Sequence, residues 1–304
     1  MADEALGLDG KVAVVTGAGA GLGRAEALAL ARSGANVVLN DLQADAVAGV
    51  AEEVEALGVK AARVAGDMSR RETADELVDT AVRQFGSLDV VVNNAGVVRD
   101  RMLFNMSDEE WDQVVGVHLR GHFLLTRNAA SYWRGRSKEL GGPVYGRLVN
   151  TASEAFLFGA EGQPNYASAK AGIASLTLAA SRGLARYGVR ANAICPRART
   201  GMTQDVFGEA PGDGADPLSP DQVAPFVSYL ASPAADRISG QVFVVYGGMV
   251  ALVSAPTVER RFDTGGDAWT LEELDSAVGG YFADRDPKRT FAASEVAQLE
   301  PKSP

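Results

Sequence analysis

The sequence of 304 residues has little of several features that would assign it to a class of protein. Its one cysteine, Cys195, excludes an internal disulfide, and two histidines leave little material for a metal site. It has no run of about eighteen apolar residues, so we expect no membrane span. Acidic residues outnumber basic ones by 39 to 29, and the resulting charge of −10 argues against nucleic acid as a partner.

The N-terminal segment MADEALGLDGK is acidic and lacks the apolar stretch of a secretory signal peptide. Together with the lone cysteine, this predicts a cytoplasmic protein. A composition rich in Ala, Gly, Val and Arg fits a bacterial source. The apolar share of 46% and the charged share of 22% are ordinary for a globular chain that buries a core.

What the sequence does contain is a regular alternation of short β-branched runs with segments of helical character. This order predicts an α/β fold, with a parallel sheet that carries helices on both faces. The expected strands are 11–17, 35–41, 60–67, 88–96, 145–153, 189–196 and 238–248. The expected helices are 22–34, 44–58, 69–86, 107–133, 165–188, 220–232 and 270–282.

Two later segments differ in composition from this pattern. Residues 199–221 are rich in Gly, Pro and Asp, which is typical of a mobile lid. The apolar residues that could close this lid over a substrate are Met202, Val206 and Phe207. We divide the chain into a main domain at 1–250 and a C-terminal extension at 251–304, which packs on the same domain or on a neighbouring subunit.

The segment TGAGAGLG, residues 16–23, follows an apolar strand and opens a helix. Gly17, Gly21 and Gly23 let the backbone approach a pyrophosphate, and the helix N-terminus around Leu22 offers free N–H donors. A tight strand-to-helix turn without a ligand is the alternative. The strand before and the helix after the glycines favour dinucleotide binding.

Asp41 ends the next strand, eighteen positions after Gly23. A carboxylate there can accept a hydrogen bond from a ribose 2′-hydroxyl and would repel a 2′-phosphate. Neither the glycine loop nor Leu42 offers a compensating basic side chain. We therefore predict NAD in preference to NADP, with a surface aspartate as the alternative.

The segment NYASAKAG places Tyr166 and Lys170 four residues apart, on one face of a helix. Ser153 ends the preceding strand. Oxidation of an alcohol needs a base for the hydroxyl proton, and a free phenol has a pKa of about 10. We expect Tyr166 to be that base, Lys170 to lower its pKa, and Ser153 to hold the substrate oxygen.

These motifs together resemble the short-chain dehydrogenase/reductase family: TGAGAGLG, NNAG at 93–96, Ser153 and YASAK at 166–170. The resemblance covers residues 8–250. It implies a single Rossmann-type domain with a sheet of about seven strands, and oxidoreduction of alcohols and ketones with a nicotinamide cofactor. It also implies a homodimer or homotetramer. The cofactor-binding residues that it implies beyond the glycine loop and Asp41 are Asp67, Met68, Asn94, Ala95, Gly96, Tyr166, Lys170, Pro196, Thr200 and Met202.

Longer stretches, such as NNAGVVRDRML and GQPNYASAKAG, look like the dehydrogenase domain of the peroxisomal multifunctional β-oxidation enzyme. They also look like bacterial dehydrogenases of hydroxyacyl-CoA or hydroxysteroids. The resemblance implies a secondary alcohol on a large apolar substrate. A 3-oxoacyl carrier-protein reductase is an alternative that Asp41 disfavours, and a non-catalytic NAD-binding protein is a second alternative.

The sequence departs from the family pattern at two positions. His118, in the helix that Ser107 and Glu110 begin with a capping-box pattern, stands where the family commonly has an asparagine of a proton relay. We include His118 in the catalytic set because histidine can bond water or a backbone group. Arg197 replaces the usual glycine after Pro196.

For Arg197 and Arg199 two roles are open: they face a phosphate or acyl-CoA group, or they are plain surface residues. For Phe156, Leu157 and Phe158 the alternatives are an apolar substrate pocket and the core. We expect Glu154, next to Ser153, to be an exposed carboxylate, with a contact to the substrate as the alternative.

Three further features of the sequence do not change this functional prediction. His118 and His122 have the i, i+4 spacing seen in zinc sites, but no Glu stands in the HExxH position and we predict no metal. A serine hydrolase would need a GxSxG elbow, and Ser153 lies instead in TASEA. Cys195 is on an apolar strand, where an inert core residue is expected.

Overall fold

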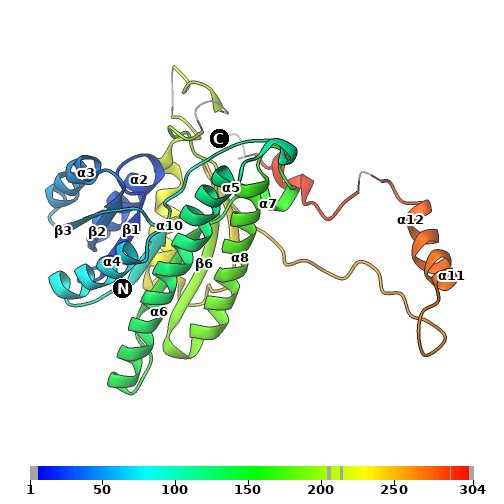
Figure 1. The fold of residues 1–304 in the computed structure, drawn as a ribbon. Coiled ribbons are helices and arrows are strands. Elements are labelled where there is room, and N and C mark those ends of the chain that lie inside the picture. The colour runs from blue at the N-terminus through cyan, green and yellow to red at the C-terminus, as the bar shows by residue number, and fades with distance from the viewer. Residues whose placement is uncertain (1–5, 204–206, 213–214, 288, 301–304) are drawn as a thin grey trace.

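The computed structural model describes residues 6–203, 207–212, 215–287 and 289–300. Its centre is one eight-stranded sheet in the order β3-β2-β1-β4-β5-β6-β7-β8 (Figure 1). The strands are β1 (Val12–Thr16), β2 (Asn36–Asp41), β3 (Ala61–Ala65), β4 (Val90–Asn93), β5 (Gly146–Thr151), β6 (Val189–Pro196), β7 (Val242–Tyr246) and β8 (Met249–Leu252).

The first seven strands are parallel, as the alternation predicts, and β8 runs antiparallel to β7. The expectation of about seven strands therefore misses β8. Gly247 and Gly248 join β7 to β8 in a two-residue hairpin, and Gly247 has a φ of 53°. A Gly-Gly pair between apolar runs is a hairpin signal that was present in the sequence.

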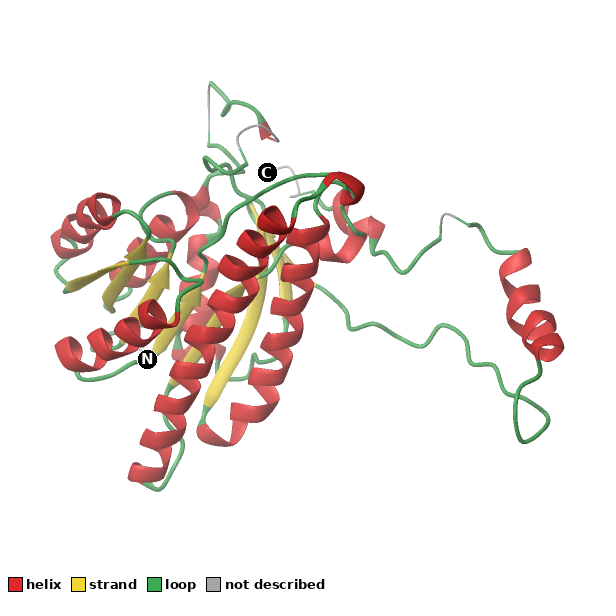
Figure 2. Ribbon diagram, in the orientation of Figure 1, coloured by secondary structure: helices red, strands yellow, loops and turns green. Residues whose placement is uncertain are grey.

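Helices cover both faces of the sheet (Figure 2). The longer ones are α2 (Gly21–Arg32), α3 (Ala44–Ala56), α4 (Arg71–Phe85), α5 (Asp108–Val115), α6 (Gly121–Leu140), α8 (Pro164–Leu184) and α10 (Ala224–Ala231). α2 contacts α3 and α10 on one face, and α6 contacts α4 and α8 on the other. Two apolar layers result, one containing Leu30 and Leu39 and the other containing Leu77 and Trp133. No helix among the described residues combines the length and hydropathy of a membrane span.

The helix expected at 107–133 is two helices joined by a π-helical turn, η2 (Gly116–Arg120). The predicted capping box is confirmed: Ser107 Oγ accepts from Glu110 N at 3.2 Å, and Glu110 Oε2 accepts from Ser107 N at 3.0 Å. The π-helical turn carries His118 and moves that side chain out of the 3.6-residue repeat. Periodicity alone gave no sign of this interruption.

The chain after β8 leaves the body and later returns to it (Figures 1 and 2). We call residues 253–292 the C-terminal arm. It carries the expected helix near 270–282 as α11 (Leu271–Leu274), a π-helical turn (Asp275–Gly279) and α12 (Gly280–Ala283). Residues 293–299, which we call the return segment, contain η7 (Ser294–Gln298) and lie against the short helix α7 (Ala155–Phe158).

Candidate active site

The glycine loop connects the carboxyl end of β1 to α2. Gly17 and Gly21 have φ values of 65° and 52°, which favour glycine. A Cβ on Gly23 would lie 2.1 Å from the Gly17 carbonyl oxygen, so no larger residue fits without moving backbone. The N-cap residue of α2, Ala20, provides no side-chain acceptor to the helix. The first N–H groups of α2 are therefore available to an anion.

Asp41 lies at the end of β2 beside this loop. Its Oδ2 accepts from Gly19 N at 3.0 Å, and its Oδ1 accepts from Leu42 N at 2.7 Å. The carboxylate is thus oriented by backbone donors and remains partly exposed at the carboxyl end of β2. Each oxygen has a further lone pair for a ligand hydroxyl.

The segment after β4 supports the glycine loop from the other side. Thr16 Oγ1 accepts from Asn94 N at 3.0 Å and from Ala95 N at 3.1 Å. The Asn94 side chain donates to Thr16 O at 3.1 Å and to Gly17 O at 3.3 Å. A Cβ on Gly96 would lie 2.2 Å from Cε1 of His118. Asn94, Ala95 and Gly96 therefore bring the glycine loop and η2 together.

The other predicted cofactor residues lie around the same edge. Asp67 Oδ1 accepts from Ser69 N at 2.8 Å, which caps the turn after β3. Met68 is buried at 4% exposure in an apolar layer, so its side chain is a core element. Thr200 approaches the glycine loop: a Cβ on Gly21 would lie 3.1 Å from its Cγ2. Pro196 ends β6, and Met202 is exposed.

Ser153, Tyr166 and Lys170 meet at the carboxyl end of β5. Ser153 lies two residues beyond that strand, and its hydroxyl is near enough to the Tyr166 phenol to lower the pKa of that phenol. Tyr166 and Lys170 project from α8. Lys170 Nζ lies 5.3 Å from the centroid of the Tyr166 ring and donates to Thr151 O at 2.6 Å.

Sequence reasoning missed Asn165, which fixes the start of α8. Its side chain is fully buried and donates to Arg99 O at 3.0 Å and to Glu110 O at 3.2 Å. Its Oδ1 accepts from Tyr166 N at 2.7 Å. The only signal was an amide directly before the tyrosine, and polarity alone does not show that a side chain will be buried.

The expected lowering of the Tyr166 pKa by Lys170 is wrong for the protein as it stands here. Burial raises the pKa of Tyr166 to about 12, and the hydrogen bond from Ser153 offsets only part of that rise. Burial also lowers the pKa of Lys170 to about 7. The same loss of solvation that disfavours a phenolate disfavours the ammonium that was expected to stabilise it.

His118 is buried beside the tyrosine. Its ring makes a T-shaped contact with the Tyr166 ring at 5.1 Å, and its Nε2 lies 2.8 Å from Val97 O and 3.0 Å from Val97 N. Burial, with the charge of Lys170 as the next cause, holds the pKa of His118 well below its ordinary value. Within the described residues, His118 and His122 belong to no cluster of three or more potential metal ligands.

The structure excludes a plain surface position for two charged residues. Glu154 is 11% exposed in its side chain and pairs with Arg197, so it is not a free surface carboxylate. Arg199 is likewise not a plain surface residue, because it pairs with Asp216 at 3.0 Å and its side chain is 16% exposed. It also donates to the carbonyl groups of Phe207 and Gly208 in the predicted lid.

The apolar residues proposed for the pocket separate into two groups. Phe156 and Leu157 pack against a buried cluster that includes Cys195, which is in the core as expected. Phe158 remains 39% exposed. Val206 lies outside the described residues.

The arrangement can thus hold a dinucleotide at the glycine loop, with a hydroxyl pair and an amine at the carboxyl edge of the same sheet. The family model for short chain dehydrogenases matches residues 11–210. The chain belongs to the short-chain dehydrogenase family. As a short-chain dehydrogenase it is an oxidoreductase that acts on CH–OH groups.

Its relatives agree with this assignment. A hydroxyacyl-CoA dehydrogenase, ChsB1, from Mycobacterium tuberculosis is 61% identical over 298 residues, which are 95% of this chain and 94% of that protein. The peroxisomal multifunctional enzyme type 2 of Mus musculus is 39% identical over 81% of this chain and 33% of its own length. The crystal structure of a short chain dehydrogenase from Mycobacterium avium aligns with a TM-score of 0.82 at 42% identity, and covers 92% of this chain and 97% of that one.

Proposed function

We propose that this short-chain dehydrogenase oxidises the secondary alcohol of a 3-hydroxyacyl-CoA with NAD as its cofactor. The observation that carries the proposal is the convergence of Ser153, Tyr166 and Lys170 at the carboxyl end of β5, at the same end of the strands as the glycine loop. The similarity to a hydroxyacyl-CoA dehydrogenase along almost the whole chain supports the substrate class.

The residues present fit a nicotinamide dinucleotide. The uncapped N-terminus of α2 and the loop glycines suit the pyrophosphate, and Asp41 suits a ribose hydroxyl. Asp67, Met68, Asn94, Ala95, Gly96, Pro196, Thr200 and Met202 complete the proposed cofactor set. When bound in its oxidised form, the cofactor supplies a hydride acceptor and a positive charge.

Within the chain, Tyr166 takes the proton of the substrate hydroxyl and Ser153 donates a hydrogen bond to the substrate oxygen. Lys170 lies beside the Tyr166 ring, and because its pKa is about 7, its ammonium form can favour the phenolate only toward the acid side of neutral pH. His118 is neutral and hydrogen-bonds Val97, and its ring packs against the Tyr166 ring in a T-shaped contact. Since the Tyr166 pKa is about 12 and oxidation needs the phenolate, we expect the oxidation rate to rise with pH.

The preference for NAD over NADP rests on Asp41. Its carboxylate lies beside Gly19, where a 2′-phosphate would meet a negative charge, and neither the glycine loop nor Leu42 supplies a compensating basic side chain. A 3-oxoacyl carrier-protein reductase that uses NADPH is disfavoured for the same reason. We expect the KM for NADP to exceed the KM for NAD by at least about tenfold.

Two further properties remain proposals. Exposed apolar side chains on α5, α6 and α8, among them Trp111, Phe123 and Leu178, support a homodimer or homotetramer. Light scattering measures this directly. The relative from a bacterium and the single cysteine support a bacterial, cytoplasmic setting.

The function is tested by NADH formation from NAD with two alcohols, a 3-hydroxyacyl-CoA and a 17β-hydroxysteroid. We expect turnover of the CoA ester, and loss of at least about 1,000-fold in kcat for Tyr166→Phe with NADH affinity unchanged. Turnover of the steroid alone would replace the substrate proposal. NADH binding without turnover of any alcohol would support a non-catalytic NAD-binding protein.

A further inference from the structure

Arg197 occupies the first position after β6, and its guanidinium group is nearly buried, with 15% of the side chain exposed. Nε donates to Glu154 Oε2 at 2.6 Å and Nη2 donates to Glu154 Oε1 at 2.7 Å. This two-point pair fixes the orientation of both side chains. Glu154 directly follows Ser153, so the pair ties the end of β6 to the loop that carries the catalytic hydroxyl.

The same guanidinium group also holds the return segment. Nη2 donates to Val296 O at 2.6 Å and Nη1 donates to Leu299 O at 2.7 Å. Tyr246, at the end of β7, donates from its hydroxyl to Leu299 O at 2.7 Å, and its ring lies 4.6 Å from the Arg197 guanidinium carbon. One side chain therefore links the loop after Ser153 to the last described part of the chain.

The return segment in turn packs on that loop. Ala293 N donates to Leu157 O at 2.8 Å. Val296 is buried at 7% exposure, in a cluster that includes Ile173 of α8 and has Phe156 and Leu157 packed against it. The segment thus supports the residues between Ser153 and Tyr166 from outside.

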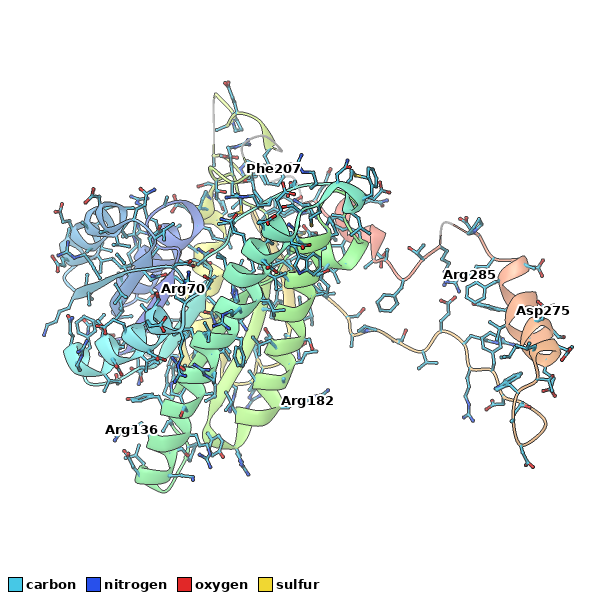
Figure 3. The ribbon with its side chains drawn as sticks, viewed as in Figure 1. Arg70, Arg136, Arg182, Phe207, Asp275 and Arg285 are labelled. Carbon is cyan, nitrogen blue, oxygen red and sulfur yellow. The ribbon has the colours of Figure 1, made fainter. Side chains whose placement is uncertain are left out.

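The arm before it contributes little to this placement. Val258, Leu271 and Phe291 are 85%, 81% and 92% exposed, and the arm helices with Asp275 and Arg285 lie far from the body (Figure 3). A connection of this length restrains the position of its end only weakly. The return segment is therefore held where it is by contacts at its own residues.

We propose that the Glu154–Arg197 pair is a latch that fastens the return segment to the loop after Ser153. Arg197 is then a positioning residue. The latched segment shapes the part of the substrate pocket that holds the acyl chain. The second half of this proposal rests on the proposed function. A direct contact of Arg197 with a CoA phosphate is disfavoured, because Glu154 already neutralises its charge, and Glu154 and two carbonyl groups together take four of its five N–H donors.

The latch itself is tested without turnover, by hydrogen exchange of the amides of Ala293, Val296 and Leu299 in the full-length protein. We expect exchange at least about tenfold faster in Arg197→Gln and in Glu154→Gln, with partial protection kept in Arg197→Lys. The matched control is Arg136→Gln, which breaks the exposed pair with Glu139 at the far end of α6 and leaves these amides unchanged.

The effect on substrate is tested by kcat/KM for a short-chain and a long-chain 3-hydroxyacyl-CoA. We expect Arg197→Gln to lower the value for the long chain about tenfold more than for the short chain, mainly through KM. Val296→Asp, which disrupts the segment from its own side, is expected to do the same. In the Val296→Asp background, Arg197→Gln is expected to add less than about twofold.

Unchanged amide exchange in both Arg197→Gln and Glu154→Gln would overturn the latch. Faster exchange with equal losses for short and long chains would overturn the effect on the acyl chain. If the wild-type protein oxidises no hydroxyacyl-CoA, the proposed function fails, and the claim about the acyl chain fails with it. The exchange measurement still decides whether the latch exists.

Discussion

The glycine loop at 16–23 and the C-terminal arm at 253–292 are held in place in opposite ways. In the glycine loop a Cβ added to any of the four glycines would lie within 3.1 Å of another atom, and on Gly23 it would overlap the Gly17 carbonyl. In the arm, the apolar side chain of Phe291 is 92% exposed. The backbone hydrogen bonds that join the arm to the body are made by Val253 at one end and by Ala293, just after the other end. A local steric requirement therefore leaves a motif in the sequence, whereas an arm held at its ends leaves almost none.

The largest effect is expected where the contacts are tightest. Gly23→Ala places a methyl group 2.1 Å from the Gly17 carbonyl oxygen, and only a backbone shift can relieve this overlap. We expect NADH affinity to fall at least about 100-fold, because the shift moves the N–H groups that face the pyrophosphate. Titration of NADH fluorescence measures it.

The matched control for this variant is Gly49→Ala. Gly49 is exposed within α3, and a Cβ there meets nothing within 4 Å. Alanine at this helical position should raise the free energy of unfolding by about 0.5–1 kcal/mol and leave NADH affinity unchanged. Equal NADH affinity in the two variants would show that the close packing around Gly23 is not needed for binding.

The surroundings of a carboxyl group, and with them its pKa, also differ between the two regions. Glu26, on the helix that follows the glycine loop, is fully buried and has no hydrogen-bond partner among the residues that the structure describes, and burial raises its pKa to about 8. Glu259, in the arm, accepts hydrogen bonds from Tyr281 and Arg285, which lower its pKa.

This contrast predicts a pH-dependent effect of intermediate size. The folded pKa of Glu26 exceeds its unfolded value of 4.5, so the folded state holds a proton that the unfolded state releases as pH rises. Between pH 5 and pH 8 this lowers the free energy of unfolding by about 3 kcal/mol. Glu26→Gln should remove that decline in urea unfolding. If Glu259→Gln, the exposed control, flattens the profile equally, the assignment to Glu26 is wrong.

The smallest effect is expected at an exposed side chain near the C-terminal end of the arm. Phe291→Ser removes a side chain that is 92% exposed, so the free energy of unfolding should change by less than about 0.5 kcal/mol. Thermal unfolding at several protein concentrations measures it. A loss above about 1 kcal/mol would mean that Phe291 is buried in solution, which a second copy of the chain could bring about.

Several features were predictable because they depend on short-range patterns. The alternation of β-branched runs and helices predicted all seven parallel strands, and the capping box at Ser107 was also predicted. The spacing of Tyr166 and Lys170 predicted their common face on α8. The π-helical turn at His118 was missed, because insertion of one extra residue in a turn depends on what packs against the helix.

Burial and long-range pairing were the properties that sequence reasoning could not predict. Nothing near Arg197 in the chain indicates that its partners are Glu154 and the carbonyl groups of Val296 and Leu299, some 40 and 100 residues away. The rise in the Tyr166 pKa also follows from burial, which several elements produce together. Opposite conclusions about the tyrosine therefore came from the spacing and from the structure.

The sequence by itself determined the parallel sheet, the glycine loop and the common face of Tyr166 and Lys170 on one helix. These depend on residue type and on spacing within one or two elements, where sterics and periodicity act directly. Only the tertiary structure decided where charge is compensated, which acids are buried, and where the end of the chain comes back to the body. Solvation and ion pairing depend on distances in space, and residues far apart in the chain set those distances.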